Sequence, residues 1–128
     1  MAIHSPLANM MSKILNSEIV GKRECSLTPF SKEGERVLEI LKDKGYLADF
    51  KVIKNEGKFV VQLNGKINKC GVISPNFNVK KAGYEAYEKR FLPAKDFGLL
   101  LVTTTQGIMT HTEAQDKGLG GRLIGYCY

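Results

Sequence analysis

A run of hydroxyl-bearing residues in the second half of the chain offers chemistry suited to a polar ligand. It directly follows the apolar segment Leu99–Val102, and its members are Thr103, Thr104, Thr105, Gln106 and Gly107. Three hydroxyls and an amide supply compact hydrogen-bond donors and acceptors, and the glycine permits a turn or a close backbone approach. Such groups suit the ribose and base edges of a nucleic acid. The alternative is a threonine-rich turn that satisfies its own backbone.

A glycine-rich segment forms a second candidate site. Its members are Gly118, Leu119, Gly120, Gly121 and Arg122. Adjacent glycines expose backbone N–H groups and admit a bulky partner, and the guanidinium of Arg122 offers a planar fork for a phosphate or a guanine. The segment precedes a predicted strand, which is the wrong order for a phosphate-binding loop and helix. The alternative is a tight helix-to-strand connection with a solvated arginine.

The residues that could support catalysis form no convincing set. Cys70 and His111 could pair as thiol and base, but no local signature surrounds them, and the threonines lack a Gly-x-Ser-x-Gly elbow. The cysteines, which also include Cys25 and Cys127, are odd in number, widely spaced and without a Cys-x-x-Cys pair. We therefore expect reduced thiols that act as small apolar residues, with no metal, no cofactor and no enzymatic activity.

The charge balance favours a polyanionic partner. The chain has 128 residues, with 19 Lys and Arg against 13 Asp and Glu, and its net charge is +6. Seven of the cations lie between Lys66 and Lys95, against Glu85 and Glu88. This excess is typical of nucleic-acid binding, although a solvated surface is the alternative. No apolar run approaches the roughly 20 residues of a membrane span, and the start resembles no secretory signal. We expect a soluble, cytoplasmic protein without membrane contact.

Two lobes of an α+β protein are predicted to position these residues. The first, residues 1–65, follows the order αβαββ, with helices on one side of a small sheet. The predicted elements are a helix over Pro6–Val20 capped by Ser5, a strand over Lys22–Thr28, a helix capped by Ser31, and strands over Tyr46–Ile53 and Lys58–Leu63. The spacing of apolar residues in the first helix predicts one buried face, made of Leu7, Met10, Met11, Ile14, Leu15 and Ile19.

The second lobe, residues 66–128, is predicted to be β-rich with one short helix. The expected strands cover Ile67–Ser74, Phe77–Lys81, Leu99–Thr103 and Arg122–Tyr128. The pattern over Tyr84–Phe91 fits either a strand or a helix. Thr110 and Glu113 form a Thr-x-x-Glu capping box, which predicts a short helix that ends at Gly118.

Five segments together resemble the S-eight (S8) family of small-subunit ribosomal proteins. They are PLANMMSKILNSE, INKCGVISP, KRFLPAKDFG, TTTQGIMTHTEA and GLGGRLIGY, in this order, and they cover nearly the whole chain. The second and third are similar to the archaeal and eukaryotic branch, and PLAN with the short loop at Asn55–Gly57 is similar to archaeal members. The resemblance implies a two-lobed fold that binds the central domain of small-subunit ribosomal RNA early in assembly, beside neighbouring ribosomal proteins. In prokaryotic members it also implies binding to the messenger RNA of the protein's own operon.

The resemblance implies RNA contacts at particular residues. The family's Ser-Thr-Ser turn falls on Thr103, Thr104 and Thr105, followed by Gln106 and Gly107, and its Gly-Gly pair falls on Gly120 and Gly121. At the next position bacterial members usually carry Glu. This chain has Arg122 there, and archaeal relatives also carry Arg. In the first lobe the implied contacts fall on Ser5, Pro6, Asn9, Ser31 and Lys32.

These observations predict a non-catalytic, RNA-binding structural protein of the small ribosomal subunit. Lys and Arg would supply affinity through phosphates, and the threonine turn with Gly120 and Gly121 would supply selectivity. A hydrolase or thiol enzyme that uses Cys70 or a threonine would lack a convergent base, and a protein–protein adaptor is the other alternative. RNA binding would weaken steeply with salt, whereas an apolar adaptor contact would not.

Overall fold

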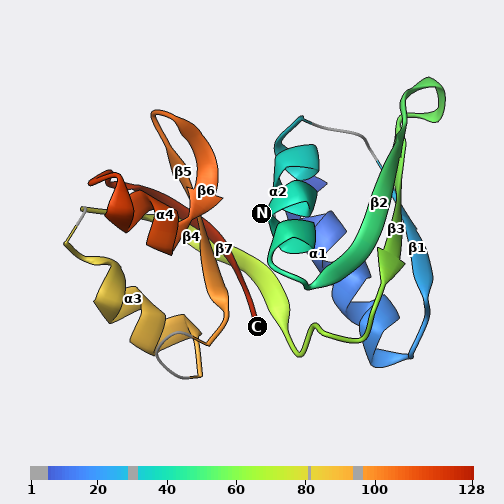
Figure 1. Ribbon diagram of the computed structural model, residues 1–128, viewed down its shortest axis with the longest axis horizontal. Helices are drawn as coiled ribbons and strands as arrows, with labels where there is room; N and C mark the ends of the chain where they lie inside the picture. Colours follow the sequence, from blue (N-terminus) through green and yellow to red (C-terminus); the bar gives the residue numbers. More distant parts are fainter. Residues whose placement is uncertain (1–5, 29–31, 81, 94–96) are drawn as a thin grey trace. The chain divides into compact units, whose positions relative to one another are not determined.

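The computed structural model describes residues 6–28, 32–80, 82–93 and 97–128. The chain divides into two units, Met1–Lys69 and Cys70–Tyr128 (Figure 1). The first unit has a three-stranded antiparallel sheet and the second a four-stranded one. Helices accompany both sheets, which confirms the α+β class predicted from the sequence.

The first unit has its elements in the predicted order αβαββ. They are α1 (Pro6–Ile19), β1 (Glu24–Leu27), α2 (Lys32–Asp43), β2 (Leu47–Ile53), a 3-10 turn η1 (Lys54–Glu56) and β3 (Lys58–Leu63). The strand order is β1-β3-β2, and Figure 1 shows α1 and α2 together on one side of the sheet. Because β1 and β2 both pair antiparallel with β3, they run parallel, and the helix before each of them begins at the same end of the unit.

Glycines end both helices of the first unit, as the sequence predicts. Gly21 has φ 77° and donates its N–H to Glu18 O at 3.1 Å, while Lys22 N–H donates to Ser17 O at 2.9 Å. The same pair of hydrogen bonds recurs at Gly45, which has φ 85°. This is the Schellman arrangement, which needs a left-handed residue that glycine adopts without strain.

The buried face of α1 differs from the predicted one at its end. Leu7, Met10, Met11 and Ile14 are buried as expected, but Ile19 is 71% exposed, so its assignment to the core was wrong. Ile19 continues the Leu15 edge of the apolar stripe, and Leu15 is itself only half-buried. The centre of the face in the last turn is instead occupied by Ser17, which is 7% exposed and lies three residues after Ile14.

The segment after β3 is tied to the first unit. The carboxylate of Glu18, near the end of α1, accepts hydrogen bonds from Gly65 N–H at 3.3 Å and from Ile67 N–H at 3.0 Å. Ile67 is buried. These contacts explain why the described division falls at Lys69/Cys70, a few residues after the end of the predicted first lobe.

In its described residues, the second unit has a four-stranded sheet and two helices. Its elements are β4 (Cys70–Val79), α3 (Tyr84–Phe91), β5 (Leu99–Thr104), β6 (Gly107–Thr110), α4 (His111–Asp116) and β7 (Gly121–Cys127). The strand order is β4-β7-β5-β6, so the last strand of the chain is central. Among the described residues, one hydrophobic cluster of the unit's core contains the buried side chains Ile73, Val79, Tyr84, Leu92, Leu100, Val102, Met109, Ala114 and Leu123.

Three features of this unit differ from the prediction. The two strands expected around Pro75 are one strand, β4, whose pairing with β7 shifts between Val72 and Phe77. Pro75 lies within this shift. Because proline has no N–H to donate to a neighbouring strand, regular pairing is interrupted at this point. The ambiguous segment is helix α3, with Tyr84 and Glu88 buried on one face, so the unit has two helices and not one. The short strand β6 was not predicted.

Candidate nucleic-acid interface

The threonine run lies where β5 leaves the core. The first four residues of β5 are buried, whereas Thr103 and Thr104 are half-buried and Thr105 is exposed. Thr104 pairs with Gly107 of β6, so Thr105 and Gln106 form a two-residue hairpin turn. Gly107 has φ 106°, a conformation that favours glycine and explains this residue at the start of β6.

The hydroxyl of Thr104 is used inside this turn. It donates to the carbonyl oxygen of Gly107 at 2.9 Å and accepts from the N–H of Gln106 at 3.1 Å. Across the described ranges of the chain, no hydrogen bond engages the hydroxyl of Thr103 or Thr105. Thr104 therefore shapes the turn, while its two neighbours keep hydroxyls that a ligand can reach.

A polar row crosses three strands beside the turn. Asn78 of β4 lies opposite Arg122 of β7, and Arg122 lies opposite Thr103 of β5. Side chains of directly opposed residues point to the same face, with their Cβ atoms about 4.5–5.5 Å apart. Asn78 and Arg122 are exposed. The row thus presents an amide, a guanidinium and a hydroxyl side by side.

The glycine segment connects α4 to β7 in a tight path. Gly118, with φ 66°, donates to Gln115 O at 3.1 Å, and the next residue closes a second Schellman-type hydrogen bond to Ala114 O. At Gly121 an added Cβ would lie 2.5 Å from Thr103 O and 2.7 Å from Val102 Cγ1. Gly121 is therefore required by the close approach of β7 to the end of β5.

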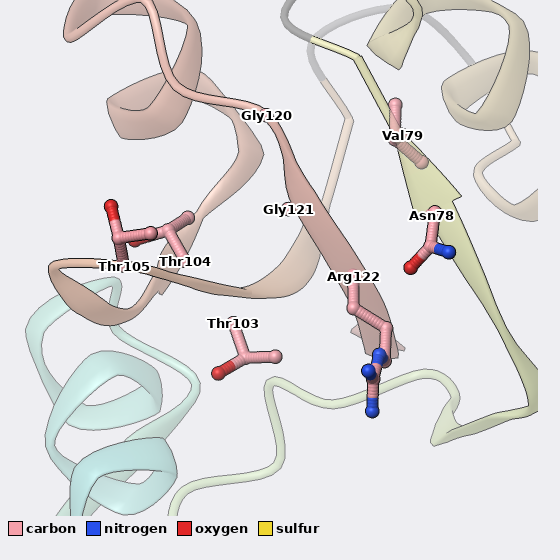
Figure 2. Close-up of a pocket in the computed structure, with 8 residues that line it drawn as sticks. All are labelled: Asn78, Val79, Thr103, Thr104, Thr105, Gly120, Gly121 and Arg122. Carbon is pink, nitrogen blue, oxygen red and sulfur yellow. The ribbon is translucent and has the colours of Figure 1, made fainter.

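These groups surround an open hollow with a volume of about 540 Å³ (Figure 2). This volume lies in the range of roughly 300–1,000 Å³ that bound small molecules occupy, so a nucleotide-sized group can enter. Six of the residues predicted from the sequence come together here, whereas Gln106 and Gly107 stay on the adjoining turn. The lining is Asn78 and Val79 from β4, Thr103, Thr104 and Thr105 from the end of β5, and Gly120, Gly121 and Arg122 from β7 and its approach.

The hollow carries positive charge. Arg122 is the charged residue of its lining, and no carboxylate lies among the lining residues. Among the residues that the structure describes, none forms an ion pair with Arg122, whereas Lys89 on α3 lies 3.9 Å from Glu85. A guanidinium is a cation with several N–H donors in one plane, so an anion such as phosphate is the natural ligand.

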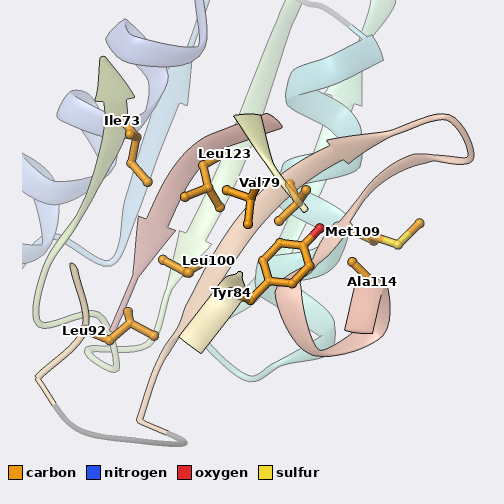
Figure 3. Close-up of a cluster of buried hydrophobic side chains, with 9 residues drawn as sticks. Ile73, Val79, Tyr84, Leu92, Leu100, Met109, Ala114 and Leu123 are labelled. Carbon is orange, nitrogen blue, oxygen red and sulfur yellow. The ribbon is translucent and has the colours of Figure 1, made fainter. Parts of the chain in front are cut away.

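Helix α3 contacts the glycine segment through a hydrogen bond from Tyr84. The hydroxyl of Tyr84 donates to the carbonyl oxygen of Leu119 at 2.9 Å, next to Gly120. Burial raises the pKa of Tyr84, so the phenol keeps the proton that it donates. Figure 3 shows the Tyr84 ring among Val79, Ala114 and the other side chains of the core cluster. The rim of the hollow is therefore anchored to the core.

Helix α4 is fixed by a cap and by a buried histidine. The hydroxyl of Thr110 accepts from Glu113 N–H at 3.3 Å, which confirms the predicted N-cap. His111 accepts from Leu100 N–H at 3.1 Å through Nδ1, and its Nε2 lies 2.8 Å from the Glu88 carboxylate. One imidazole thus joins α3, α4 and β5, and β5 carries the threonines that line the hollow.

The residues predicted in the first unit lie at the beginnings of its helices. Pro6 is the first residue of α1, Asn9 is exposed on the same helix, and Lys32 begins α2 and is exposed. The two helices begin at the same end of the unit, as described above. The remaining candidates, Ser5 and Ser31, lie outside the described residues.

The alternative chemistries find little support in the geometry. Both ring nitrogens of His111 are engaged, so neither is available as a base for Cys70. Cys25, Cys70 and Cys127 are buried, and no disulfide joins them among the described residues. In the described ranges, no group of three or more His, Cys, Asp or Glu could hold a metal ion, and no helix is long and apolar enough to cross a membrane.

A comparison with known families fits this arrangement. The family model for ribosomal protein S8 matches residues 5–128, nearly the whole chain. The chain belongs to the ribosomal protein S8 family. It is therefore a ribosomal protein that binds ribosomal RNA and other ribosomal proteins in translation, and its family is one of structural proteins rather than enzymes.

Sequence reasoning missed Asn78 as part of the hollow. Its segment was assigned to a strand, but strand pairing cannot be deduced from one short run of residues. The pairing of β4 with the last strand of the chain, with its shift between Val72 and Phe77, brings Asn78 opposite Arg122. Asn78 lies between two apolar residues, Phe77 and Val79, and this alternation was the signal that could have drawn attention to it.

Proposed function

We propose that this chain is a structural constituent of the small ribosomal subunit, of the archaeal type, and that it binds the central domain of small-subunit ribosomal RNA directly. The hollow of the second unit is the principal contact surface. Binding there holds an irregular RNA element in shape and supports assembly of the subunit beside neighbouring small-subunit proteins.

One observation carries this proposal. The guanidinium of Arg122, the hydroxyls of Thr103 and Thr105 and the backbone at Gly120 converge on one open hollow without internal partners in the described part of the chain. A cation for phosphate, small hydroxyls for ribose and an unobstructed backbone are the groups that recognise non-helical RNA. An adaptor surface would instead be expected to be apolar at its centre.

The first unit contributes further phosphate and sugar contacts in this proposal. Lys32, with Pro6 and Asn9, lies at the helix beginnings that face one end of the unit, and Ser5 and Ser31 adjoin them in sequence. Binding of the protein's own operon messenger follows if that messenger folds into an element with the same shape. Competition between the two RNAs for one site tests this part.

The experiment is a filter-binding titration at several salt concentrations. The probes are a central-domain fragment of small-subunit ribosomal RNA and an unrelated duplex of equal length. The Arg122→Ala variant should bind both RNAs more weakly, and its plot of log affinity against log salt should be shallower by up to about one unit, because one phosphate contact is lost.

Lys89→Ala is the matched control, because Lys89 is an exposed cation of the same unit that lies on α3, outside the hollow. It should leave both the affinity and the salt slope close to those of the parent. Equal effects of the two substitutions would mean that any surface cation serves, and the hollow would lose its role. Binding that does not respond to salt would favour a protein adaptor.

A further inference from the structure

Asn78 is the lining residue of the hollow that carries an amide, and this amide is not used inside the described fold. It is exposed on β4, and across the ranges that the structure describes no hydrogen bond engages its side chain. Asn64 is the contrasting case, since its amide donates to Gly45 O at 3.1 Å and accepts from Lys66 N–H at 3.2 Å. One asparagine builds a turn, and the other presents a free amide to the hollow.

The amide has a chemistry that the other lining groups lack. A carboxamide holds two donors and an acceptor in one plane, so it can pair with a donor and an acceptor that lie side by side. Guanidinium only donates, and a hydroxyl rotates and fixes no such pattern. In Figure 2 Asn78 projects from the strand next to the one that carries Arg122. The amide is therefore suited to a base edge and the guanidinium to a phosphate.

We infer that Asn78 is a specificity-determining residue that hydrogen-bonds through its amide to the edge of an unpaired base in the bound RNA. The inference rests on the proposed RNA-binding function of the hollow. The base presents a donor beside an acceptor, as adenine does. Arg122 then holds a phosphate of the same strand, so affinity and base selectivity come from neighbouring residues of one row.

The test combines protein variants with base substitutions in the RNA. Asn78→Ala removes the amide, and Asn78→Thr does so while keeping a residue that favours strands. Gln62→Ala is the matched control, because it removes an exposed amide from β3 of the first unit. Circular dichroism and thermal unfolding first establish that each variant is folded. Each unpaired nucleotide of the central-domain fragment is then replaced in turn, and affinities are measured by filter binding.

Both Asn78 variants should bind the central-domain fragment about 5- to 150-fold more weakly, with an unchanged salt slope and unchanged binding to the unrelated duplex. At one nucleotide, base replacement should weaken the parent protein but have no further effect on the Asn78 variants. The Gln62→Ala protein should retain the parent's full pattern.

Two results would overturn the inference, and they can be told apart. If the parent selects the central-domain fragment but both Asn78 variants respond to every base replacement as the parent does, Asn78 contacts no base and the proposed function stands. If the parent itself binds the fragment no better than the duplex, the proposed function fails and takes the inference with it.

Discussion

The surface of the first unit around β2 and the hollow of the second unit use similar polar residues in opposite ways. Lys42 lies 2.9 Å from Asp49, which also accepts from its neighbour's N–H, and Lys58 lies 3.1 Å from Glu56. Arg122 and Asn78 in the hollow have no such partners in the part of the chain that is described. In the first region Lys42, Asp49, Lys58 and Glu56 engage one another, whereas the hollow presents Arg122 and Asn78 to a ligand.

The difference separates structural polar residues from residues available for binding. A hydroxyl such as that of Thr104 lies in the hollow but is engaged by the turn, so position alone does not identify a contact residue. Within the second unit, the engaged groups of Tyr84, Thr110 and His111 fix the elements that carry the unengaged ones. Substitutions in the two classes should therefore affect different measurements.

The largest effect is expected at Gly121, because a Cβ there would approach the backbone of Thr103 to 2.5 Å. Gly121→Ala should lower the free energy of unfolding by about 1–3 kcal/mol and displace the end of β5. Affinity for the central-domain RNA should fall with it. Chemical denaturation and filter binding on the same preparation give both quantities.

Gly45→Ala provides the comparison in the first unit. Gly45 has φ 85° and open space around it, so the substitution strains the backbone by about 1 kcal/mol without a clash. It should reduce stability and leave RNA affinity unchanged. If Gly121→Ala were as mild as Gly45→Ala in both measurements, the close packing of β7 on β5 would not govern the hollow.

The second prediction separates two adjacent threonines. Thr104→Val removes both hydrogen bonds of the turn and should cost about 0.5–1.5 kcal/mol of stability for each that water does not replace. Thr103→Val removes a hydroxyl with no partner among the described residues, so stability should hold while affinity for the central-domain RNA falls about 5- to 150-fold. Stability comes from thermal unfolding and affinity from filter binding. The reverse assignment of the two effects would show that Thr104 is the contact residue.

The sequence brought out six residues that line the hollow, but it did not indicate which of their side chains are engaged inside the fold. Residue types and family resemblance brought out the threonines, the glycines and Arg122, because these lie in contiguous segments. Asn78 was missed since it joins them only through long-range strand pairing. The engagement of Thr104 was also hidden, because a hydroxyl in a turn has the same sequence signal whether it bonds the backbone or faces a ligand.

The fold shows the same limit. Helix ends at Gly21, Gly45 and Gly118 were predictable because capping is a local property. Strand β6 was not, because its four residues carry almost no periodicity and it forms only by pairing with β5. Ile19 was misplaced because the apolar stripe of α1 continues beyond the part of the helix that is covered.

The third prediction concerns the scaffold behind the hollow. Thr110→Ala removes the N-cap of α4 and should cost about 1 kcal/mol of stability, seen as a lower midpoint of thermal unfolding. Thr105→Ala is the control, since Thr105 is exposed and makes no hydrogen bond within the described chain. An unchanged midpoint for Thr110→Ala would mean that the cap contributes nothing to the stability of the second unit.

The smallest effect is expected at the ion pair of the first unit. The hydrogen bond from Lys42, with that from the Phe50 backbone, lowers the pKa of Asp49. A depressed carboxyl pKa contributes stability above the unfolded-state value and loses it as the pH falls through the folded-state value. Lys42→Met should raise the pKa of Asp49 toward its ordinary value, as followed by NMR titration of the carboxyl carbon. Because both groups are about half exposed, the stability at neutral pH should hardly change.

Affinity of the Lys42→Met variant for the central-domain RNA should also stay at the parent's value, unlike that of Arg122→Ala. Lys58→Met, which breaks a different pair, should leave the Asp49 titration where it is. A loss of RNA affinity in Lys42→Met as large as in Arg122→Ala would contradict the distinction between the two surfaces, since an engaged cation would then bind RNA as well as an unengaged one.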